Sequence, residues 1–423
     1  MIYLGLGTNC GDRRQHLATA IAKLQKGGFR IKLTSPIVES PALLKEDAKP
    51  QWSQPFLNLV LEGETHLTPH ALLALAKKIE QAMGRDMQAP RWSPRNIDID
   101  LLLWGEQKIS TKELTIPHPQ MHKRAFVVTP LMHIAPHLKL PNYMLTPMQI
   151  SEQIRPIPLW MGIVNLSTDS FSDGGVNSDT DELESRLHGW ISEGVQILDI
   201  GAESTRPNAP EITAETEWAL LKPIFSLLDK LRKRHALMPL ISIDTRHSGT
   251  AGRALEYGAD WINDVSGLGD PRMIALVRDN HCGAVAMHSL SVPVKPGEVL
   301  DSSRPVEAQV SEWLQQRAQQ WERAGLGRQR IIFDPGIGFG KSVLQNLNLI
   351  KSIGTLRQQG FRVLAGHSRK SFMNTFTGRE FADRDVETLG LSLAMCEQGV
   401  DILRVHDPVM HIRAYRAWSH AQA

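Results

Sequence analysis

The second part of this chain repeats one pattern eight times, and this repetition constrains the fold more than any other feature. Each repeat is a short apolar run that ends in polar residues, and segments with helical periodicity separate most of the runs. The runs end at residues 165, 204, 245, 265, 288, 334, 368 and 407. Apolar strands that are followed by helices pair in parallel with both faces buried. Eight such units predict an α/β fold of the (β/α)8 type, a TIM barrel, over 158–423.

The strand ends of the predicted barrel carry polar side chains. In such a barrel the carboxyl ends of all strands meet at one rim, where catalytic groups lie. A single polar residue after a strand is often an ordinary turn residue. Polar residues after every strand indicate instead a functional site at the rim. These residues are Asn165, Asp199, Glu203, Asp244, Asn263, Asp264, His288, Asp334, Ser368, Arg404 and His406.

The first part of the chain, 1–140, follows a less regular pattern. Its strand-like runs lack a helix after each of them, which indicates an α+β fold. Prolines interrupt any regular structure in 141–157, which we interpret as a linker between two domains, 1–140 and 158–423. In the first domain the expected strands are 3–9, 31–40, 56–64 and 97–104, and the expected helices are 12–26 and 68–83.

Composition excludes several classes of partner. The charged residues nearly cancel, with a formal net charge of +2, which argues against a nucleic-acid surface and a polybasic membrane surface. We therefore expect small-molecule partners, no nucleic acid and no membrane. Cys10, Cys282 and Cys396 lie far apart without CxxC spacing and predict reduced thiols rather than disulfides or zinc ligands. The start has no secretory pattern, so we expect a cytoplasmic protein.

The densest chemistry of the first part lies at 91–100, where the sequence is RWSPRNIDID. On a strand, Asp98 and Asp100 project from the same face about 6–7 Å apart. Two carboxylates at that separation can bracket a pair of Mg2+ ions that neutralise a polyphosphate. A lone DxD is more often a solvated edge of a sheet, but guanidinium groups beside it match phosphate geometry. The candidate guanidinium groups are those of Arg85, Arg91, Arg95 and Arg124.

This segment resembles the signature of hydroxymethyldihydropterin pyrophosphokinases. The opening YLGLGTNCGD and the segments 56–58, 80–85 and 116–126 fit the same family in the same order. The resemblance implies a ferredoxin-like α+β fold and transfer of the β,γ-pyrophosphoryl group of ATP to the hydroxymethyl oxygen of the pterin. It also implies that Asp98 and Asp100 hold two Mg2+ ions, with Arg95 catalytic beside them. By the same resemblance, the pterin is bound by Asn58 and Phe126, and ATP by Glu80, Arg85, Arg91, Arg95, His118 and Arg124.

The predicted barrel rim offers a second set of ligand-binding groups. Glycines between 336 and 340 allow a flat ligand to approach the backbone closely. Asp244, Asn263 and Asp334 can hydrogen-bond the donor-rich edge of a pterin, and Lys370 can act on its other edge or on a phosphate. The donors available to a diphosphate are Thr205, Arg206, Arg404 and His406, and the neutral oxygen available to Mg2+ is that of Asn165.

The segments DIGAESTRP at 199–207, DPGIGFGK at 334–341 and GHSRK at 366–370 closely resemble dihydropteroate synthases. That family joins p-aminobenzoate to the methylene carbon of the dihydropterin, with loss of diphosphate. We predict a largely dissociative displacement, with Asp244, Asp334 and Lys370 as its catalytic residues. The resemblance implies pterin binding by Asp199, Asp244, Asn263, Met287, Asp334 and Lys370, binding of diphosphate with one Mg2+ by Asn165, Arg404 and His406, and a p-aminobenzoate side formed by Thr205, Pro207, Phe339 and Ser368.

Several alternatives stay open at this point. Asp334 can form a structural salt bridge at the bottom of the barrel, and Arg369 and Lys370 can form a solvated basic patch. Pterin-dependent methyltransferase barrels share a similar glycine-rich pocket, and one half of the chain can be a silent scaffold for the other. The barrel family also implies a homodimer through the second domain.

Overall fold

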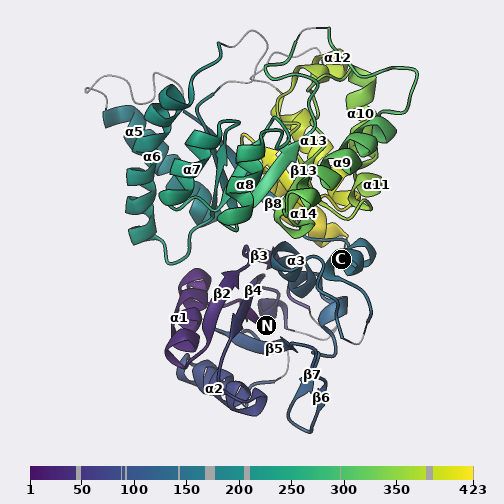
Figure 1. Cartoon of the computed structure of the whole chain (residues 1–423). Coiled ribbons are helices and arrows are strands. Elements are labelled where there is room, and N and C mark those ends of the chain that lie inside the picture. Colours follow the sequence, from purple (N-terminus) through teal and green to yellow (C-terminus); the bar gives the residue numbers. More distant parts are fainter. Residues whose placement is uncertain are drawn as a thin grey trace. The chain divides into compact units, whose positions relative to one another are not determined.

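The computed structural model describes residues 1–43, 49–86, 88–90, 93–141, 143–166, 177–203, 210–295, 297–377 and 384–422. The chain divides into two compact units, Met1–Ile157 and Pro158–Ala423 (Figure 1). Each unit contains its own cluster of buried apolar side chains, as expected of separate domains. Among the described residues, no helix is both long enough and apolar enough to cross a membrane.

The first unit is an antiparallel sheet with helices packed on it, which confirms the predicted ferredoxin-like α+β fold. The strand order is β2-β4-β1-β5, and β3 pairs with the first residues of β4. Helices α3 and α4 pack on the sheet through Tyr3, Val60 and Leu102. The elements are β1 (Ile2–Thr8), α1 (Arg13–Lys26), β2 (Arg30–Thr34), β3 (Val38–Ser40), β4 (Phe56–Glu64), α2 (Pro69–Ala82), β5 (Asp98–Trp104), β6 (Ile109–Ser110), β7 (Thr115–Ile116), α3 (Ala125–Ile134) and α4 (Pro147–Ile154).

The register of this sheet gathers residues of the first predicted site around Gly7. Gly7 pairs with Asn58 of β4 on one side and with Asp98 of β5 on the other. A Cβ atom at position 7 would lie 3.0 Å from the Oδ1 atom of Asn58, so glycine leaves room for that amide. Beyond the end of β1, the Oδ1 atom of Asn9 accepts a hydrogen bond of 2.8 Å from the N–H of Arg95. Strand β1 therefore fixes the position of Asn58 on one side of the site and of Asp98 on the other.

The strand expected over 31–40 is two strands, β2 and β3. Pro36 lies between them and has no N–H to donate to a sheet. The Oγ atom of Ser35 accepts a hydrogen bond of 2.8 Å from the N–H of Val60, so a side chain takes over the pairing at this point. The prediction was wrong here because a proline within an otherwise strand-like run removes a donor N–H from the ladder and divides the strand.

The segment 141–157, expected to be a linker, contains helix α4 and belongs to the first unit. Thr146 and Gln149 form a capping box, and Pro147 takes the first helical position, where its missing N–H costs nothing. Ile150 is buried in the core under α3. The linker prediction was therefore wrong, because proline does not only interrupt regular structure but also begins helices.

The second unit is a closed barrel of eight parallel strands in the order β10-β11-β12-β13-β14-β15-β8-β9, which confirms the predicted TIM barrel (Figure 1). Strands β8 and β15 close the ring through parallel pairing of Leu159 with Ile402. The strands are β8 (Leu159–Asn165), β9 (Ile197–Gly201), β10 (Leu240–Asp244), β11 (Trp261–Asp264), β12 (Gly283–Met287), β13 (Ile331–Asp334), β14 (Arg362–Ala365) and β15 (Ile402–Val405).

The helices of the second unit surround this ring and bury its outer face. Leu187, Leu228, Leu314 and Leu349, from four different helices, belong to one buried cluster with the strand residue Ile200. The barrel therefore presents its strand ends, rather than its flanks, to ligands. The helices are α5 (Asn177–Glu193), α6 (Ala214–Arg234), α7 (Ser248–Glu256), α8 (Pro271–Asp279), α9 (Val306–Arg323), α10 (Val343–Lys351), α11 (Ile353–Arg357), α12 (Asn374–Thr377), α13 (Asp385–Glu397) and α14 (Pro408–Ala421).

We predict that Ile150→Ala lowers the free energy of unfolding of the first unit by about 2–4 kcal/mol, the cost of truncating a buried aliphatic side chain. Ile150 is 3% exposed. Urea denaturation followed by circular dichroism measures the change. The matched control is Glu152→Ala on the exposed side of the same helix, which should change this free energy by less than about 0.5 kcal/mol. Equal effects of the two substitutions would show that α4 is not part of this core.

Candidate functional sites

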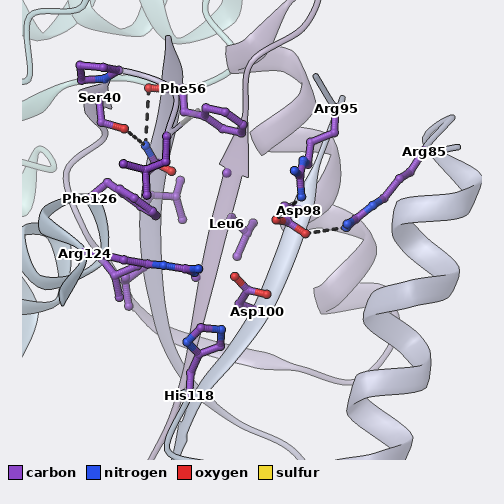
Figure 2. A pocket seen from close by; sticks show the side chains of 18 of the residues that line it. Leu6, Ser40, Phe56, Arg85, Arg95, Asp98, Asp100, His118, Arg124 and Phe126 are labelled. Atoms are coloured by element: carbon purple, nitrogen blue, oxygen red, sulfur yellow. Dashed lines mark hydrogen bonds and ion pairs between the residues drawn. The ribbon is translucent and has the colours of Figure 1, made fainter. Parts of the chain in front are cut away.

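A cavity of about 330 Å³ in the first unit gathers most of the residues predicted for the first site (Figure 2). Its walls come from β1, β4 and β5, from the end of β3 and from the start of α3. Figure 2 shows the carboxylates of Asp98 and Asp100 on one wall, with Arg124 and Phe126 on the other. The predicted residues that line the cavity are Asn58, Arg85, Arg95, Asp98, Asp100, His118, Arg124 and Phe126.

Asp98 and Asp100 lie on the same face of β5, as their spacing predicts. The intervening Ile99 is fully buried on the opposite face, while both carboxylates reach the cavity. Arg85 and Arg95 donate to the two oxygens of Asp98 at 2.5 Å and 2.9 Å. Burial would raise the pKa of Asp98, but the charges of Arg95 and Arg85 outweigh it and hold that pKa below its usual value.

Asp100 carries the charge that is least compensated in this cavity. Burial raises the pKa of Asp100 to about 6, and the negative charge of Asp98 adds to this rise. Among the described residues, no three carboxylate, histidine or cysteine side chains form a metal cluster. Two carboxylates alone suit Mg2+, which takes one or two protein carboxylates and completes its shell with water and substrate phosphates. The donor set therefore fits a divalent cation that arrives with a polyphosphate.

Glu80 does not face the cavity, although it was expected to contact the nucleotide. Its side chain is fully buried, accepts a hydrogen bond of 2.8 Å from the N–H of Ile99 and pairs with Arg85 at 2.7 Å. Glu80 thus positions Arg85 and the start of β5 from behind. The expectation was wrong because sequence cannot show which side of α2 turns toward the sheet. Lys77, one turn earlier on α2, pairs with Glu80 at 2.9 Å and lines the cavity.

Asn58 lines the cavity from β4, and Phe126 lines it from α3. The Nδ2 atom of Asn58 donates to the Oγ atom of Ser40 at 3.0 Å, which fixes the orientation of the amide. The guanidinium group of Arg124 lies 5.7 Å from the ring centroid of Phe126, within cation–π range. Sequence reasoning missed Ser40, which is the last residue of β3 and belongs to no motif. A rigid amide and an aromatic face are suitable for a flat heterocycle.

His118 is held as a neutral imidazole beside the carboxylates. Its Nδ1 atom accepts a hydrogen bond of 3.3 Å from the N–H of Gln120, which leaves the proton on Nε2. Burial lowers the pKa of His118 to about 4, and the positive charge of Arg124 adds to this. His118 therefore offers a neutral donor to the cavity near pH 7. Arg91, the remaining residue predicted for this site, lies outside the described residues.

The second candidate site is a charged cluster inside the rim of the barrel. The Nε atom of Arg404 pairs with Asp199 at 2.6 Å, and its second terminal nitrogen pairs with Asp244 at 2.6 Å. Asp199 also accepts hydrogen bonds from Asn263 at 3.0 Å and from Ser242 at 2.6 Å. Burial raises the pKa of Asp244 to about 7, although the charge of Arg404 acts against this rise. Residues from four strands thus meet at one point.

Asp334 and Lys370 belong to the same cluster. A Cβ atom at Gly366 would lie 3.5 Å from the Oδ2 atom of Asp334 and 3.8 Å from the Cδ atom of Arg404, so these two side chains meet over a glycine. Burial lowers the pKa of Lys370 to about 7, and the charge of Asp334 opposes this fall. The Nζ atom of Lys370 lies 4.3 Å from the ring centroid of Phe339. The predicted convergence at the rim is therefore present.

The two structural alternatives for these residues do not hold. Asp334 ends β13 at the rim, and the buried salt bridge between Arg357 and Asp401, of 3.0 Å, lies before the strands instead. Arg369 pairs with Asp385 at 2.6 Å, and Lys370 points into the cluster. Neither a barrel-bottom role for Asp334 nor a solvated basic patch at 369–370 therefore describes this structure.

The remaining predicted rim residues surround the cluster. The Oγ atom of Ser368 lies 2.9 Å from the Nδ1 atom of His406 and accepts the backbone N–H of His406 at 3.2 Å. Met287 packs against Phe339 in a small apolar group. Asn165 ends β8 with an exposed side chain, and one neutral oxygen there suits an Mg2+ ion that brings its own anion. Thr205, Arg206 and Pro207 lie outside the described residues.

Sequence reasoning missed the basic partners of two predicted rim residues, Glu203 and His288. Glu203 accepts two hydrogen bonds of 2.9 Å from Arg246. Lys341 is 8% exposed and its Nζ atom lies 3.0 Å from the Nδ1 atom of His288. A lysine or arginine is normally a surface residue. Only the fold therefore reveals that Arg246 is partly buried and Lys341 is buried.

Comparison with known proteins agrees with both sites. Residues 3–136 match the family model of 7,8-dihydro-6-hydroxymethylpterin-pyrophosphokinase, and residues 161–406 match that of pterin binding enzymes. A folate synthesis bifunctional protein of Chlamydia caviae is 34% identical, covering 99% of this chain and 98% of its own. This chain belongs to the bifunctional folate synthesis proteins. A relative of the same name from Arabidopsis thaliana is 32% identical over 98% of this chain and 94% of its own.

Solved synthases resemble the second unit of this bifunctional folate synthesis protein. The dihydropteroate synthase of Xanthomonas albilineans with 4-aminobenzoic acid is 35% identical, covers 63% of this chain and 93% of its own, and has a TM-score of 0.55. That of Anaplasma phagocytophilum with 6-hydroxymethylpterin-monophosphate is 34% identical over 62% of this chain and 99% of its own, with a TM-score of 0.55. The chain is thus a pyrophosphokinase and a dihydropteroate synthase, which leaves the methyltransferase and silent-scaffold alternatives without support.

The predicted cytoplasmic location stays a prediction. The relatives include a form from Arabidopsis thaliana that is named mitochondrial, 34% identical over 96% of this chain and 80% of its own.

We predict that Asp100→Asn stabilises the metal-free protein at pH 8 by about 1–2 kcal/mol, because the folded state holds the Asp100 proton more tightly than the unfolded state does. With a pKa raised to about 6, the ionised carboxylate costs stability as pH rises from about 4 to about 6, and the cost is complete above that range. The gain should vanish near pH 4. Urea denaturation in EDTA at both pH values measures it, and a variant less stable than the wild type at pH 8 would contradict the prediction.

Proposed function

We propose that the two sites act one after the other on the same heterocycle. The first attaches a diphosphate, taken from ATP, to the hydroxymethyl oxygen of 6-hydroxymethyl-7,8-dihydropterin. The second expels that diphosphate when p-aminobenzoate joins the methylene carbon, which gives 7,8-dihydropteroate. One observation about each unit carries this proposal. The first unit has a cavity lined by carboxylates and arginines, and the second has buried carboxylates paired with an arginine at the barrel rim.

In the first site the arginines and the histidine receive the phosphates of ATP. Arg95 and Arg85 already lie at the cavity wall and keep further donors free to match phosphate oxygens. His118 adds a neutral Nε2–H, and Arg124 a further positive charge. Lys77, also on the cavity wall, is an additional candidate that the family resemblance did not supply. Positioning and charge stabilisation are the main tasks of a protein in such transfers.

Asp98 and Asp100 hold the Mg2+ ions of the first site, two by resemblance to the family. When bound, the ions neutralise the phosphates and the charge that develops during transfer. Asp98 keeps a charge because Arg95 and Arg85 hold its pKa low. Asp100 is ionised above pH 6, so it offers both oxygens at neutral pH.

The pterin lies between Asn58 and Phe126 in the first site. The amide of Asn58 hydrogen-bonds the edge of the heterocycle, and the ring of Phe126 stacks on its face. Support comes from Ser40, which orients the amide at 3.0 Å, and from Gly7, which leaves room for it. Asn58 and Phe126 line the same cavity as the carboxylates, so the hydroxymethyl group of a bound pterin can reach the phosphates.

In the second site the rim cluster binds the pterin through paired polar groups. Asp244, Asn263 and Asp334 take the aminopyrimidinone edge, Lys370 takes the other edge, and Asp199 and Met287 complete the pocket. Such buried pairs discriminate strongly, because a wrong ligand leaves them unpaired. Arg404 and His406 bind the diphosphate, and Asn165 supplies an oxygen to the Mg2+ ion that accompanies it. Thr205, Pro207, Phe339 and Ser368 form the side of p-aminobenzoate, and Arg206 is a further donor for the diphosphate.

The chemistry of the second site follows from its charges. The methylene carbon becomes electron-poor as its bond to the diphosphate oxygen breaks, and the electron-rich pterin ring shares that positive charge. Asp244 and Asp334 stabilise the charged ring, while Arg404 stabilises the departing anion. The arylamine nitrogen then attacks the methylene carbon and loses a proton. Because Arg404 pairs with Asp199 and Asp244 at 2.6 Å each, binding of substrate must redistribute these contacts.

We predict that Asp98→Asn abolishes AMP formation but leaves the synthase active, and that Lys370→Met has the opposite effect. The two sites lie in separate units, so each variant controls for the folding of the other half. The purified chain is incubated with ATP, Mg2+, hydroxymethyldihydropterin and p-aminobenzoate, and AMP and dihydropteroate are followed together. Pre-formed pterin diphosphate tests the synthase of Asp98→Asn directly. Formation of ADP in place of AMP would contradict the pyrophosphoryl transfer.

We predict that Asp244→Asn lowers kcat of the synthase by about 100-fold or more, the scale of losing one group that stabilises developing charge. Affinity for Mg2+-diphosphate, measured by calorimetry, should change by less than about threefold, since that interaction is made before charge develops. Asp229→Asn, an exposed acid on α6, is the matched control. Equal losses in turnover and diphosphate binding would argue against a role of Asp244 on the ring.

A further inference from the structure

Lys341 is a buried lysine whose three ammonium hydrogens each have an acceptor. Its Nζ atom lies 2.8 Å from the carbonyl oxygen of Phe339, 3.0 Å from the Nδ1 atom of His288 and 3.4 Å from the carbonyl oxygen of His288. Burial lowers the pKa of His288 to about 3, and the charge of Lys341 adds to this, so Nδ1 is free to accept. An ammonium group has three donors and no acceptor, and this site offers an acceptor to each donor, although burial lowers the pKa of Lys341 to about 7 against the charge of Asp334.

These contacts join the end of β12 to the glycine loop that follows β13. The loop residues Gly336, Gly338 and Gly340 have φ angles of +68°, +84° and +64°, which other residues rarely adopt. A Cβ atom at Gly336 would lie 1.9 Å from the carbonyl oxygen of His288 and 3.2 Å from Nζ of Lys341. The loop therefore passes so close to β12 that only glycine fits, and the ammonium closes the remaining gap.

The loop that Lys341 closes carries groups that face the second site. Asp334, just before it, accepts a hydrogen bond of 2.7 Å from the N–H of Gly336. Phe339 packs against Met287 and Val265, and its ring lies 4.3 Å from the Nζ atom of Lys370. The orientation of the Phe339 ring depends on its backbone, and the carbonyl of that backbone is bound by Lys341.

The position of Phe339 depends on Lys341 more than the position of Asp334 does. Asp334 is fixed by its place at the end of β13, in register with Met287, and by the N–H of Gly336. The backbone groups of Phe339 itself make two hydrogen bonds, its N–H with the carbonyl of Gly336 at 3.0 Å and its carbonyl with Lys341, while the neighbouring Gly338 and Gly340 are bound to Asn346 and Leu300. Loss of the ammonium would remove one of the two hydrogen bonds that fix the Phe339 peptide and leave the carboxylate of Asp334 in place.

We propose that Lys341 is a positioning residue of the synthase reaction, which fixes Phe339 and thereby the p-aminobenzoate side of the site. This inference rests on the proposed assignment of Phe339 to that side. Lys341 touches neither substrate, and it acts through the carbonyl of Phe339 and through His288. Its effect is therefore on the second substrate, p-aminobenzoate, rather than on the pterin.

The test compares Lys341→Met, which keeps the length of the side chain and removes the charge, with Lys351→Met, an exposed lysine at the end of α10. We expect Lys341→Met to raise KM for p-aminobenzoate about tenfold, the size of one lost charged hydrogen bond. KM for the pterin diphosphate should change less than about twofold, because Asp334 keeps its contacts. AMP formation by the first unit should stay unchanged in the same samples. Lys351→Met should leave all three quantities unchanged.

Substitutions of His288 give a second measurement that does not require a change at position 341. In His288→Asn the amide oxygen stands near the position of Nδ1 and keeps an acceptor for Lys341, whereas His288→Leu removes it. We expect KM for p-aminobenzoate to rise in His288→Leu and to return toward the wild-type value in His288→Asn. Equal values in the two variants would overturn the role of the Lys341 contact.

A double-substitution cycle separates this inference from the proposed function. If Lys341 acts through Phe339, Lys341→Met should add little to KM for p-aminobenzoate in a Phe339→Ala background, since residues in one pathway are not additive. Additive effects, or a KM for both substrates that rises in proportion, would overturn the positioning role. A Phe339→Ala variant with a normal KM for p-aminobenzoate would instead overturn the assignment of Phe339 in the proposed function.

Discussion

The compensation of buried charge at the rim is the constraint on which the second unit depends. Arg404 pairs with both Asp199 and Asp244 in one place, over separations of 205 and 160 residues. A buried charge without a partner costs several kcal/mol. Residues from β9, β10 and β15 can meet only when the ring of strands closes. The site and the fold therefore stabilise one another, and a ligand at the rim meets side chains whose charges are already paired with each other.

The first unit solves a similar problem with less compensation. Asp98 has two arginine partners, while the neighbouring Asp100 is opposed by the charge of Asp98 and by burial. The uncompensated carboxylate is a cost in the free protein and an advantage when a cation binds. Functional sites often keep such local costs, because stability elsewhere in the fold covers them. The two units thus show different arrangements of charge, one with a carboxylate left uncompensated and one with its buried carboxylates paired to a shared arginine.

Both units also use glycine to bring backbone and side chains closer than other residues allow. Gly7 gives space to the amide of Asn58, and Gly336 lets the loop after β13 approach the carbonyl of His288. In each case a strand end or loop carries the glycine, and a neighbouring polar group takes the space. This pattern explains why short glycine-containing motifs mark both sites, and why the polar groups they serve lie elsewhere in the chain.

The sequence by itself determined the barrel, the antiparallel first domain, the shared face of Asp98 and Asp100, and the set of polar groups at the rim. Each of these depends on local periodicity, which alternation along a strand or repetition of strand and helix expresses directly. Only the tertiary structure decided that Glu80 is buried behind the cavity, that α4 joins the first core, and that Lys341 is enclosed. Burial and charge pairing depend on which distant segments pack together, and no local pattern carries that information.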